Sequence, residues 1–292
     1  MKGIILAGGS GSRLYPLTKV ASKQLQAVYD KPMIYYPLTT LMAAGIDDIC
    51  IVTTPHDTQR FQSLLHSGQQ WGIKLTFLEQ KRPSGIADAL LLTEEFVGRS
   101  NFAIILGDNI FSGGSDIPNA IDEFEKGATI FAYHVPLPTR YGVVEFNQDM
   151  QAISLEEKPL RPKSNFAITG LYLYDHTAFS LAKSLVPSSR GELEITDLNV
   201  KFLNANELKV HRLSRGYAWL DSGNSESLHD ASNYIAAIEK RQGIKIGCPE
   251  EAALVRGFVK AKDLMKDIQQ MPECDYKNYI KRVAADYEKG EF

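Results

Sequence analysis

Short apolar segments alternate with amphipathic ones along the first third of the chain. Four apolar segments have the length of buried strands, at residues 2–7, 48–53, 74–78 and 102–106. Three helical patterns lie between them, at residues 32–44, 58–66 and 86–97. This alternation is typical of βαβ units, so we expect an α/β fold with a Rossmann-like, mostly parallel sheet flanked by helices.

The pattern changes after about residue 129. Strand-like pieces joined by loops follow at residues 129–135, 143–146, 153–156 and 167–174, and helical patterns at 177–185 and 196–205. Beyond Asp221 the chain reads as mostly helical, with residues 225–241 as the longest helix. We therefore expect a catalytic body over residues 1–222, divided into parts 1–110 and 111–222, and a helical C-terminal segment over 223–292.

Composition narrows the function classes. The 292 residues are 44% apolar and 23% charged, as in an ordinary globular protein, and the net charge is −3. A phosphate site must then be built locally, and the absence of a Lys/Arg-rich run argues against nucleic-acid binding. No apolar run is long enough for a membrane span. Cys50, Cys248 and Cys274 read as free thiols of a cytoplasmic protein.

A glycine loop follows the first predicted strand. Gly8, Gly9 and Gly11, with Ser12, let backbone N–H groups approach phosphate oxygens, and Arg13 supplies a guanidinium fork. The loop lacks the Lys of a P-loop and the third glycine of a dinucleotide fingerprint, so a nicotinamide enzyme is disfavoured. A glycine-rich turn without a ligand remains an alternative for the loop taken alone.

Candidate phosphate and metal groups lie near predicted strand ends, where ligands of such sheets bind. Lys23 could reach phosphates held by the loop, or be a solvated surface lysine. Asp108 fits a Mg²⁺ ligand, or a turn cap after its strand. Asp221 could be a second ligand, although taken alone the N-cap of the next helix is the favoured interpretation.

Two weaker signals complete this reading. Glu156-Glu157-Lys158 could grip a sugar hydroxyl and a sugar phosphate, or form a surface ion pair of little energetic value. The six histidines show no spacing typical of metal ligands, and no Ser/His/Asp or Cys/His pairing stands out.

Taken together, the chain resembles the bacterial sugar nucleotidylyltransferases over nearly its whole length. The segments that carry the resemblance are residues 2–14, 22–25, 29–38, 106–110, 141–146, 153–159, 169–172, 190–197 and 216–221. The resemblance implies Mg²⁺-dependent transfer of a nucleotide from dTTP to α-D-glucose-1-phosphate, giving dTDP-glucose and pyrophosphate for deoxysugar and cell-surface polysaccharide synthesis. It also implies a homotetramer with feedback inhibition by a dTDP-deoxysugar.

The resemblance also implies roles for single residues. The nucleotide site would comprise Gly8, Gly9, Gly11, Ser12, Arg13, Lys23, Gln24, Gln80, Gly85 and Asp108. The sugar-phosphate site would comprise Asn109, Tyr141, Gly142, Glu157, Lys158, Ile168 and Arg190. Asp108 and Asp221 would bind the metal, and the catalytic set would be Arg13, Lys23, Asp108, Lys158 and Asp221.

The chain departs from the family pattern in two places. Beside the presumed base pocket, Lys81, Arg82 and Asp88 replace uncharged residues, and Asp88 stands where the pattern has glutamine. Residues 26–27 read Gln-Ala instead of the usual Leu-Pro. These changes leave the predicted phosphate and metal residues in place, but they open the question of base preference or of a second nucleotide-sugar site.

Three alternatives remain at this point. The same chemistry could use another base or sugar, for example UTP, because a methyl group gives only about 1–3 kcal/mol of discrimination. A catalytically silent nucleotide-sugar sensor is a second possibility. A glycosyltransferase is the third, but the Asp-x-Asp metal motif that it would need is missing at residues 108–110.

Overall fold

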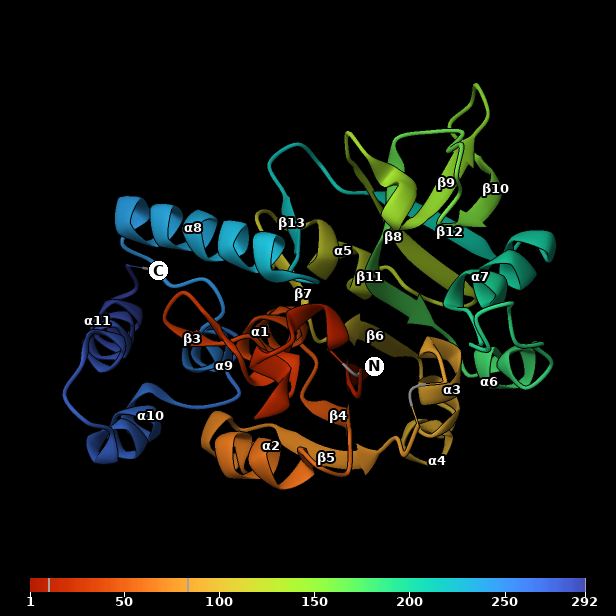
Figure 1. Ribbon diagram of the computed structural model, residues 1–292. Coiled ribbons are helices and arrows are strands. Elements are labelled where there is room, and N and C mark those ends of the chain that lie inside the picture. Colours follow the sequence, from red (N-terminus) through yellow and green to blue (C-terminus); the bar gives the residue numbers. More distant parts are fainter. Residues whose placement is uncertain (10, 83, 292) are drawn as a thin grey trace.

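The computed structural model describes residues 1–9, 11–82 and 84–291. Within them a nine-stranded sheet is flanked by helices (Figure 1). Its main path runs through β10 (Ala152–Glu157), β9 (Gly142–Phe146), β11 (Phe166–Tyr174), β6 (Phe102–Leu106), β1 (Lys2–Ala7), β4 (Asp48–Thr53) and β5 (Lys74–Glu79). Off this path, β8 (Ala128–His134) pairs with β11, and β12 (Leu208–Arg212) pairs with β8.

The sheet has two halves of different character. Strands β6, β1, β4 and β5 are parallel, whereas β11 runs antiparallel to β6, β8 and β9. The predicted fold class is confirmed: an α/β fold with a Rossmann-like, mostly parallel sheet, helices on its faces and a helical C-terminal segment. The division into catalytic parts and an appendage stays a prediction.

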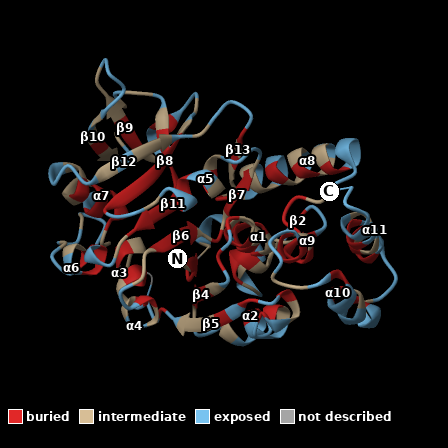
Figure 2. Cartoon of the chain, turned by 180° about the vertical axis from the view of Figure 1, so that it is seen from behind, coloured by how far each residue is buried: buried red, intermediate tan, exposed pale blue. Residues whose placement is uncertain are grey.

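Side-chain alternation along the central strands builds two separate cores. On β1, Ile5 and Ala7 belong to one core while Ile4 and Leu6 belong to the other. The period of two sends successive side chains to opposite faces, and both faces are covered, which is why the strands read as continuous apolar runs. Figure 2 shows the buried residues on these strands and on the inner faces of the helices.

Each face of the sheet has its own helices. One core includes residues of α1 (Tyr35–Ala43), α2 (Thr58–Leu65), α5 (Asp116–Asp122) and α9 (Pro249–Val255). The other includes residues of α3 (Ile86–Leu91), α4 (Glu94–Val97), α6 (Thr177–Ala182) and α7 (Ile195–Asn204). The carboxyl ends of β1, β5 and β6 are left for the functional site.

Several local predictions were wrong or incomplete. The single helix predicted over residues 86–97 is two helices, because the buried Thr93 bonds through its hydroxyl to the carbonyl of Leu90 at 2.7 Å and starts α4. Sequence patterns also missed α5, β12 and the short strand β7 (Asn109–Ser112). β7 pairs with β13 (Ala218–Asp221), more than a hundred residues away, so no local pattern marks it.

The C-terminal segment is helical, as predicted, with α8 (Ser225–Gln242), α9, α10 (Ala261–Asp267) and α11 (Asp275–Lys289). Cys50 and Cys248 are buried free thiols, and Cys274 is an exposed one. None of the described helices combines the length and the apolarity needed to cross a bilayer.

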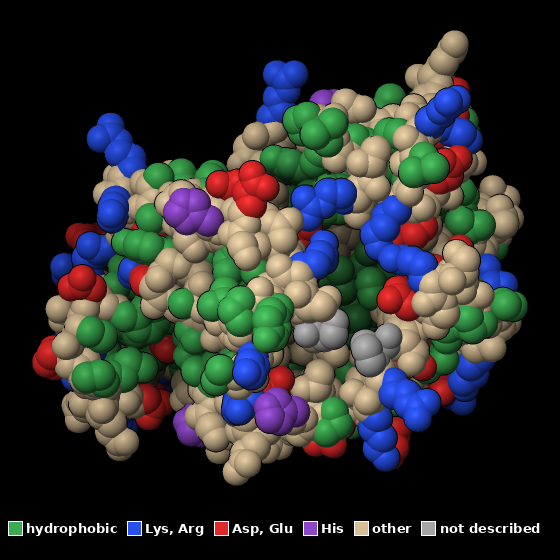
Figure 3. Space-filling model, in the orientation of Figure 1, with side chains coloured by type: hydrophobic (Ala, Val, Ile, Leu, Met, Phe, Trp, Pro, Cys, Tyr) green, Lys and Arg blue, Asp and Glu red, His purple; other side chains and the backbone are tan. Residues whose placement is uncertain are grey.

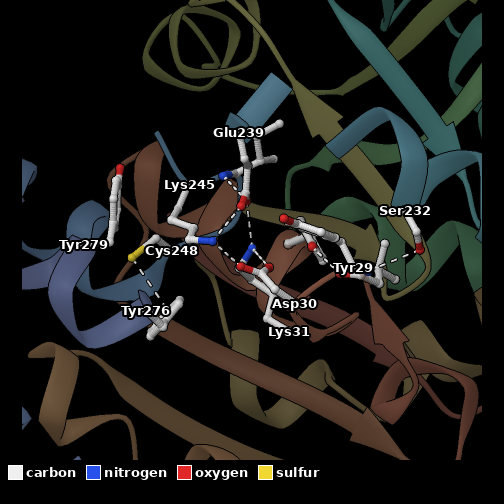
Figure 4. Close-up of polar contacts among 12 residues, drawn as sticks. Tyr29, Asp30, Lys31, Ser232, Glu239, Lys245, Cys248, Tyr276 and Tyr279 are labelled. Carbon is white, nitrogen blue, oxygen red and sulfur yellow. Dashed lines mark hydrogen bonds and ion pairs between the residues drawn. The ribbon is translucent and has the colours of Figure 1, made fainter. Parts of the chain in front are cut away.

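An ionic cluster around the buried pair of Lys31 and Glu239 ties α8 to the hairpin of β2 (Ala27–Val28) and β3 (Lys31–Pro32). We call Asp30, Lys31, Glu239 and Lys245 the anchor cluster (Figure 4). The Nζ of Lys31 lies 2.5 Å from Asp30 and 2.9 Å from Glu239, and Lys245 pairs with the same two carboxylates. The cluster balances two positive charges with two negative ones, as a buried set requires.

Candidate active site

The glycine loop brings Arg13 to the edge of the sheet. Gly11 has φ +60, and a Cβ there would lie 2.7 Å from the side chain of Thr18, so glycine is required. The short helix Ser12–Leu14 follows and is pinned by the buried side chain of Leu14. Arg13 then projects toward the end of β13: its Nη2 lies 3.2 Å from the position of a Cβ on Gly223. Ser10, also in the loop, lies outside the described residues.

Lys23 is not a solvated surface lysine, so that interpretation was wrong. It lies on the short helix Lys23–Leu25, is only 6% exposed and forms an ion pair with Oδ2 of Asp108. A buried ammonium needs a partner of opposite charge. Lys23 therefore sits beside the residues that the sequence assigned to the phosphates and the metal.

Asp108 follows β6 and is held from its other side by Asn109. The Nδ2 of Asn109 donates to Oδ1 of Asp108 at 2.9 Å. The Oδ1 of Asn109 accepts hydrogen bonds from Nε1 of Trp219 at 2.6 Å and from the amide of Gly170 at 2.9 Å. Asn109 thus lines the cavity but also fixes the rotamer of the carboxylate next to it.

Asp221 ends β13, directly opposite Asn109 in the strand pair. Its interpretation as a helix N-cap was wrong, because Asn224 caps α8: the Oδ1 of Asn224 accepts the amide of Ser227 at 2.9 Å. Burial and the negative charge of Asp108 raise the pKa of Asp221, against the opposing effect of Lys23 and Arg13. A bound cation stabilises the ionised form of a carboxylate in such an environment.

The two aspartates fit a magnesium site. Both present hard oxygen donors to the same cavity, and the backbone amide of Ser222 bonds to the carbonyl of Asp108 at 3.1 Å. Across the described residues, no group of three or more His, Cys, Asp or Glu side chains could hold a metal. Mg²⁺ needs no such cage, since it is commonly bound by one or two carboxylates and completed by substrate phosphates and water.

The predicted sugar-phosphate residues meet on the opposite wall. The backbone amide of Lys158 bonds to the carbonyl of Tyr141 at 3.0 Å, and its Nζ lies 3.2 Å from Oε1 of Glu157. The Oε2 of Glu157 accepts the hydroxyl of Thr196 at 2.6 Å. A Cβ on Gly142 would lie 3.1 Å from Ile168, so the wall is closely packed there.

Arg190 is held by carboxylates. Its guanidinium lies 2.7 Å from Glu194, 3.4 Å from Glu157 and 3.6 Å from Glu192. Burial lowers the pKa of Arg190, but the glutamates outweigh it and raise the pKa above its ordinary value. Arg190 keeps its charge and faces the cavity from a carboxylate-rich rim.

One cavity of about 600 Å³ collects most of the predicted site. Its lining includes Gly8, Gly9, Arg13, Gln24, Gln80, Gly85, Asp108, Asn109, Tyr141, Gly142, Glu157, Lys158, Ile168, Arg190 and Asp221. Gly11, Ser12 and Lys23 are not part of the lining, although Lys23 contacts Asp108 directly. The space-filling view shows a hollow on this face with Lys and Arg side chains along its rim (Figure 3).

Sequence reasoning missed several lining residues, among them Arg140, Thr169, Trp219 and Glu194. Arg140 immediately precedes Tyr141, and Trp219 lies within a segment that carried the family resemblance. The sequence positions of Arg140 and Trp219, next to or within predicted site segments, could have indicated them. Their residue types alone did not.

Several buried polar atoms at the site have no hydrogen-bond partner among the residues that the structure describes. Gln24 Oε1 and Thr169 Oγ1 belong to residues of the cavity wall, and Ser22 Oγ and Ser222 Oγ belong to the neighbours of Lys23 and Asp221. Buried polar groups in folded proteins are normally satisfied. These four atoms lie at or beside the cavity wall, which fits a site that binds a polar ligand, whereas the other described atoms of this kind, such as Asp48 Oδ1 and Trp71 Nε1, belong to residues outside the lining.

Comparisons with known proteins agree with this geometry. Residues 2–238 match the nucleotidyl transferase family. The glucose-1-phosphate thymidylyltransferase of Xanthomonas campestris is 52% identical over 285 residues, 97% of each chain. That of Mycobacterium tuberculosis is 48% identical over 282 residues, 96% of this chain and 98% of its own. The fold also matches a UDP-glucose pyrophosphorylase complexed with UDP-glucose, at TM-score 0.71 and 25% identity, over 82% of this chain and 99% of that one.

Proposed function

Since this chain belongs to the nucleotidyl transferase family, we propose that it transfers a thymidylyl group from dTTP to α-D-glucose-1-phosphate, giving dTDP-glucose and pyrophosphate. The main observation behind this proposal is that one cavity is lined by cationic side chains from distant parts of the chain and by the carboxylates of two aspartates. The cations include Arg13, Lys158 and Arg190, and the aspartates are Asp108 and Asp221. The choice of substrates is supported by relatives named for this activity, which are about half identical to this chain over nearly its full length. Products of this kind feed deoxysugar and cell-surface polysaccharide synthesis.

The two walls divide the substrates between them. On one wall the amides of the glycine loop, Arg13 and Lys23 hold the triphosphate, with Gln24, Gln80 and Gly85 at the nucleoside end. On the other wall Lys158 and Arg190 hold the sugar phosphate, while Asn109, Tyr141 and Glu157 contact the sugar. Two polyanions repel each other, so holding them in place is most of the catalytic task.

The reaction is a single displacement. An oxygen of the sugar phosphate attacks the α-phosphorus in line, the P–O bond to the β-phosphate breaks, and pyrophosphate leaves with the electron pair. Sugar phosphate is ionised near neutral pH, so no general base and no protein nucleophile are needed. Arg13 and Lys23 stabilise the charge that develops on the transferred and departing phosphates.

Asp108 and Asp221 would hold Mg²⁺. A bound ion would supply Lewis-acid chemistry there, neutralising phosphate charge and making the α-phosphorus more electrophilic. Lys23, which pairs with Asp108, would contribute its positive charge beside the same phosphates. A homotetramer, feedback inhibition by a dTDP-deoxysugar and a cytoplasmic location are further parts of the proposal that rest on the family resemblance.

A substrate panel tests the proposal. Pyrophosphate release is measured with dTTP, UTP, dCTP and dATP against several hexose-1-phosphates, with Mg²⁺ and with excess EDTA. We expect the highest kcat/KM for dTTP with glucose-1-phosphate, measurable use of UTP, and loss of turnover with EDTA. Tight nucleotide-sugar binding without turnover for any pair would instead make the protein a sensor.

A further inference from the structure

Asp88 contacts Gln80 at the nucleoside end of the cavity. Gln80 comes directly after β5, is 7% exposed and lines the cavity. Asp88 lies in the first turn of α3, and its Oδ2 accepts a hydrogen bond from Nε2 of Gln80 at 2.9 Å. This aspartate is one of the places where the chain departs from the family pattern, which has glutamine there.

The contact fixes which end of the Gln80 amide faces the cavity. Its second recorded partner is the carbonyl oxygen of Gly85, 3.4 Å from the same Nε2. Turning the amide over would set Oε1 against a carboxylate and a carbonyl, and an ionised carboxylate has no proton to donate. The favourable orientation of the Gln80 amide is therefore the one in which Nε2 points toward Asp88.

Oε1 is left as the group that a ligand can use. Both side-chain hydrogen bonds of Gln80 to described residues involve Nε2. Oε1 lies on the side of Gly8, where a Cβ would come within 3.0 Å of it, so only glycine leaves the approach open. Gln80 thus offers an acceptor, and no donor, next to the glycine loop.

We propose that Asp88 is a positioning residue for base selection, which locks Gln80 as an acceptor for an N–H on the Watson–Crick edge of a pyrimidine. This inference rests on the proposed function, because it requires a nucleoside triphosphate in the cavity. Thymine and uracil carry N3–H, whereas N3 of cytosine is an acceptor and would face Oε1 with two lone pairs opposed. The lock therefore rejects cytosine and does not separate thymine from uracil.

Glutamine at position 88, as in the family pattern, would not set this orientation by itself. A neutral amide can either donate or accept, so the pair of glutamines has two hydrogen-bonded arrangements. An ionised aspartate has one. The departure that opened the question of base preference thus strengthens the preference for a keto pyrimidine.

The test compares kcat/KM for dTTP, UTP and dCTP with glucose-1-phosphate in the wild type, Asp88→Asn and Asp88→Glu. In Asp88→Asn the amide pair can turn over, so we expect the dTTP/dCTP ratio to fall by about tenfold. The dTTP/UTP ratio should stay within about twofold, and the change should lie in the nucleotide KM. Asp88→Glu keeps the acceptor and should restore the ratio.

Two controls separate this role from a structural one. In a Gln80→Ala background, Asp88→Asn should change the dTTP/dCTP ratio by less than about twofold, because the lock has nothing to hold. Glu94→Gln, at the start of the neighbouring α4, should leave all ratios unchanged.

The outcomes are distinct. If Asp88→Asn lowers kcat/KM for dTTP and dCTP equally, Asp88 only supports the fold and the inference is overturned while the proposed function stands. If the wild type transfers no nucleotide from any triphosphate, both fail together.

Discussion

The anchor cluster and the active-site cavity both gather charged side chains from distant parts of the chain, yet they are completed in opposite ways. In the anchor cluster two lysines and two carboxylates satisfy one another, and Glu239 also accepts the backbone amide of Ile246 at 2.9 Å. At the cavity, Gln24 and Thr169 keep polar atoms with no partner in the described part of the chain, and Asp221 has a raised pKa. A structural cluster closes on itself, whereas a functional one leaves positions that ligands must fill.

Two aspartates show the difference most clearly. Burial raises the pKa of Asp30, but hydrogen bonds from Lys245 and Lys31 outweigh it, and the pKa ends below its ordinary value. Burial also raises the pKa of Asp221, and there the charge of Asp108 adds to it and the nearby cations do not compensate. The first carboxylate stabilises the fold, and the second has the environment expected of the cation ligand that we propose it to be.

The largest expected effect is the loss of turnover in Asp108→Asn. Removing a charge that organises both the metal and Lys23 should lower kcat by at least ~10³-fold, the size expected when a developing charge loses its main stabiliser. The fold should survive, since Asn109 can still bond to the new side-chain oxygen and the charge of Asp221 remains close to the buried Lys23. Steady-state pyrophosphate release in Mg²⁺, with circular dichroism as the control, checks this. Near-native activity would remove Asp108 from the metal site.

A substitution in the anchor cluster should lower the free energy of unfolding and leave the rate of the reaction unchanged. Lys31→Met leaves Asp30 and Glu239 with Lys245 as their only charged partner in the cluster, and breaking a buried pair in this way costs about 3–5 kcal/mol. The matched control is Lys266→Met in the exposed pair with Asp263, which should cost less than about 1 kcal/mol. Urea unfolding measures both. Equal effects would show that the anchor cluster is not energetically special.

The kcat of folded Lys31→Met enzyme should equal that of the wild type. A large loss of kcat with an unchanged free energy of unfolding would reverse the assignment of the two regions.

Lys158→Ala should have a smaller and selective effect. Loss of one charge-assisted contact to the sugar phosphate is worth about 1.5–3 kcal/mol, which corresponds to a rise of roughly 10- to 100-fold in the KM for glucose-1-phosphate. The KM for dTTP should change far less, because we propose that the triphosphate binds at the glycine loop and not at Lys158. Initial-rate kinetics with each substrate varied gives both constants, and parallel changes would place Lys158 outside the sugar site.

The smallest effects concern pH, and their signs differ between the two regions. Because the folded pKa of Asp30 is lowered, its stabilisation is present above its ordinary pKa of 3.8 and is lost as the pH falls through the folded value. The folded pKa of Asp221 is raised, so its favourable contribution exists below 3.8 and is lost as the pH rises through the folded value.

Calorimetry of two variants checks these signs. At pH 7 and without Mg²⁺, Asp30→Asn should lower Tm, whereas Asp221→Asn should raise it. The Tm difference for Asp30→Asn should shrink in strong acid. Shifts of the same sign for both variants would contradict the comparison.

Sequence patterns were sufficient where structure is local. The apolar runs of β1, β4 and β6 are buried on both faces, so they stand out without any knowledge of their neighbours. β12 is an edge strand with a half-polar sequence. β7 forms only by pairing with β13, which lies about a hundred residues further along the chain. Those elements are set by tertiary pairing, which periodicity does not record.

The same limit applies to the site. Family motifs located Arg13, Lys158 and Asp221, and the structure brings them to one cavity. The local sequence favoured Asp221 as the N-cap of the next helix. The residue that caps α8 is Asn224, only three positions further along the chain. Arg140 was missed because an exposed arginine on a loop has no distinctive pattern until the opposite wall is known.

The stereochemical course at the α-phosphorus tests the account most directly. The enzyme is given one diastereomer of dTTP carrying sulfur on the α-phosphate, with glucose-1-phosphate, and the configuration of the thio-substituted dTDP-glucose is read by ³¹P NMR. Attack by the sugar phosphate held between the two walls predicts inversion. Retention would require an intermediate covalently bound to the protein and would contradict the single displacement on which the proposed function rests.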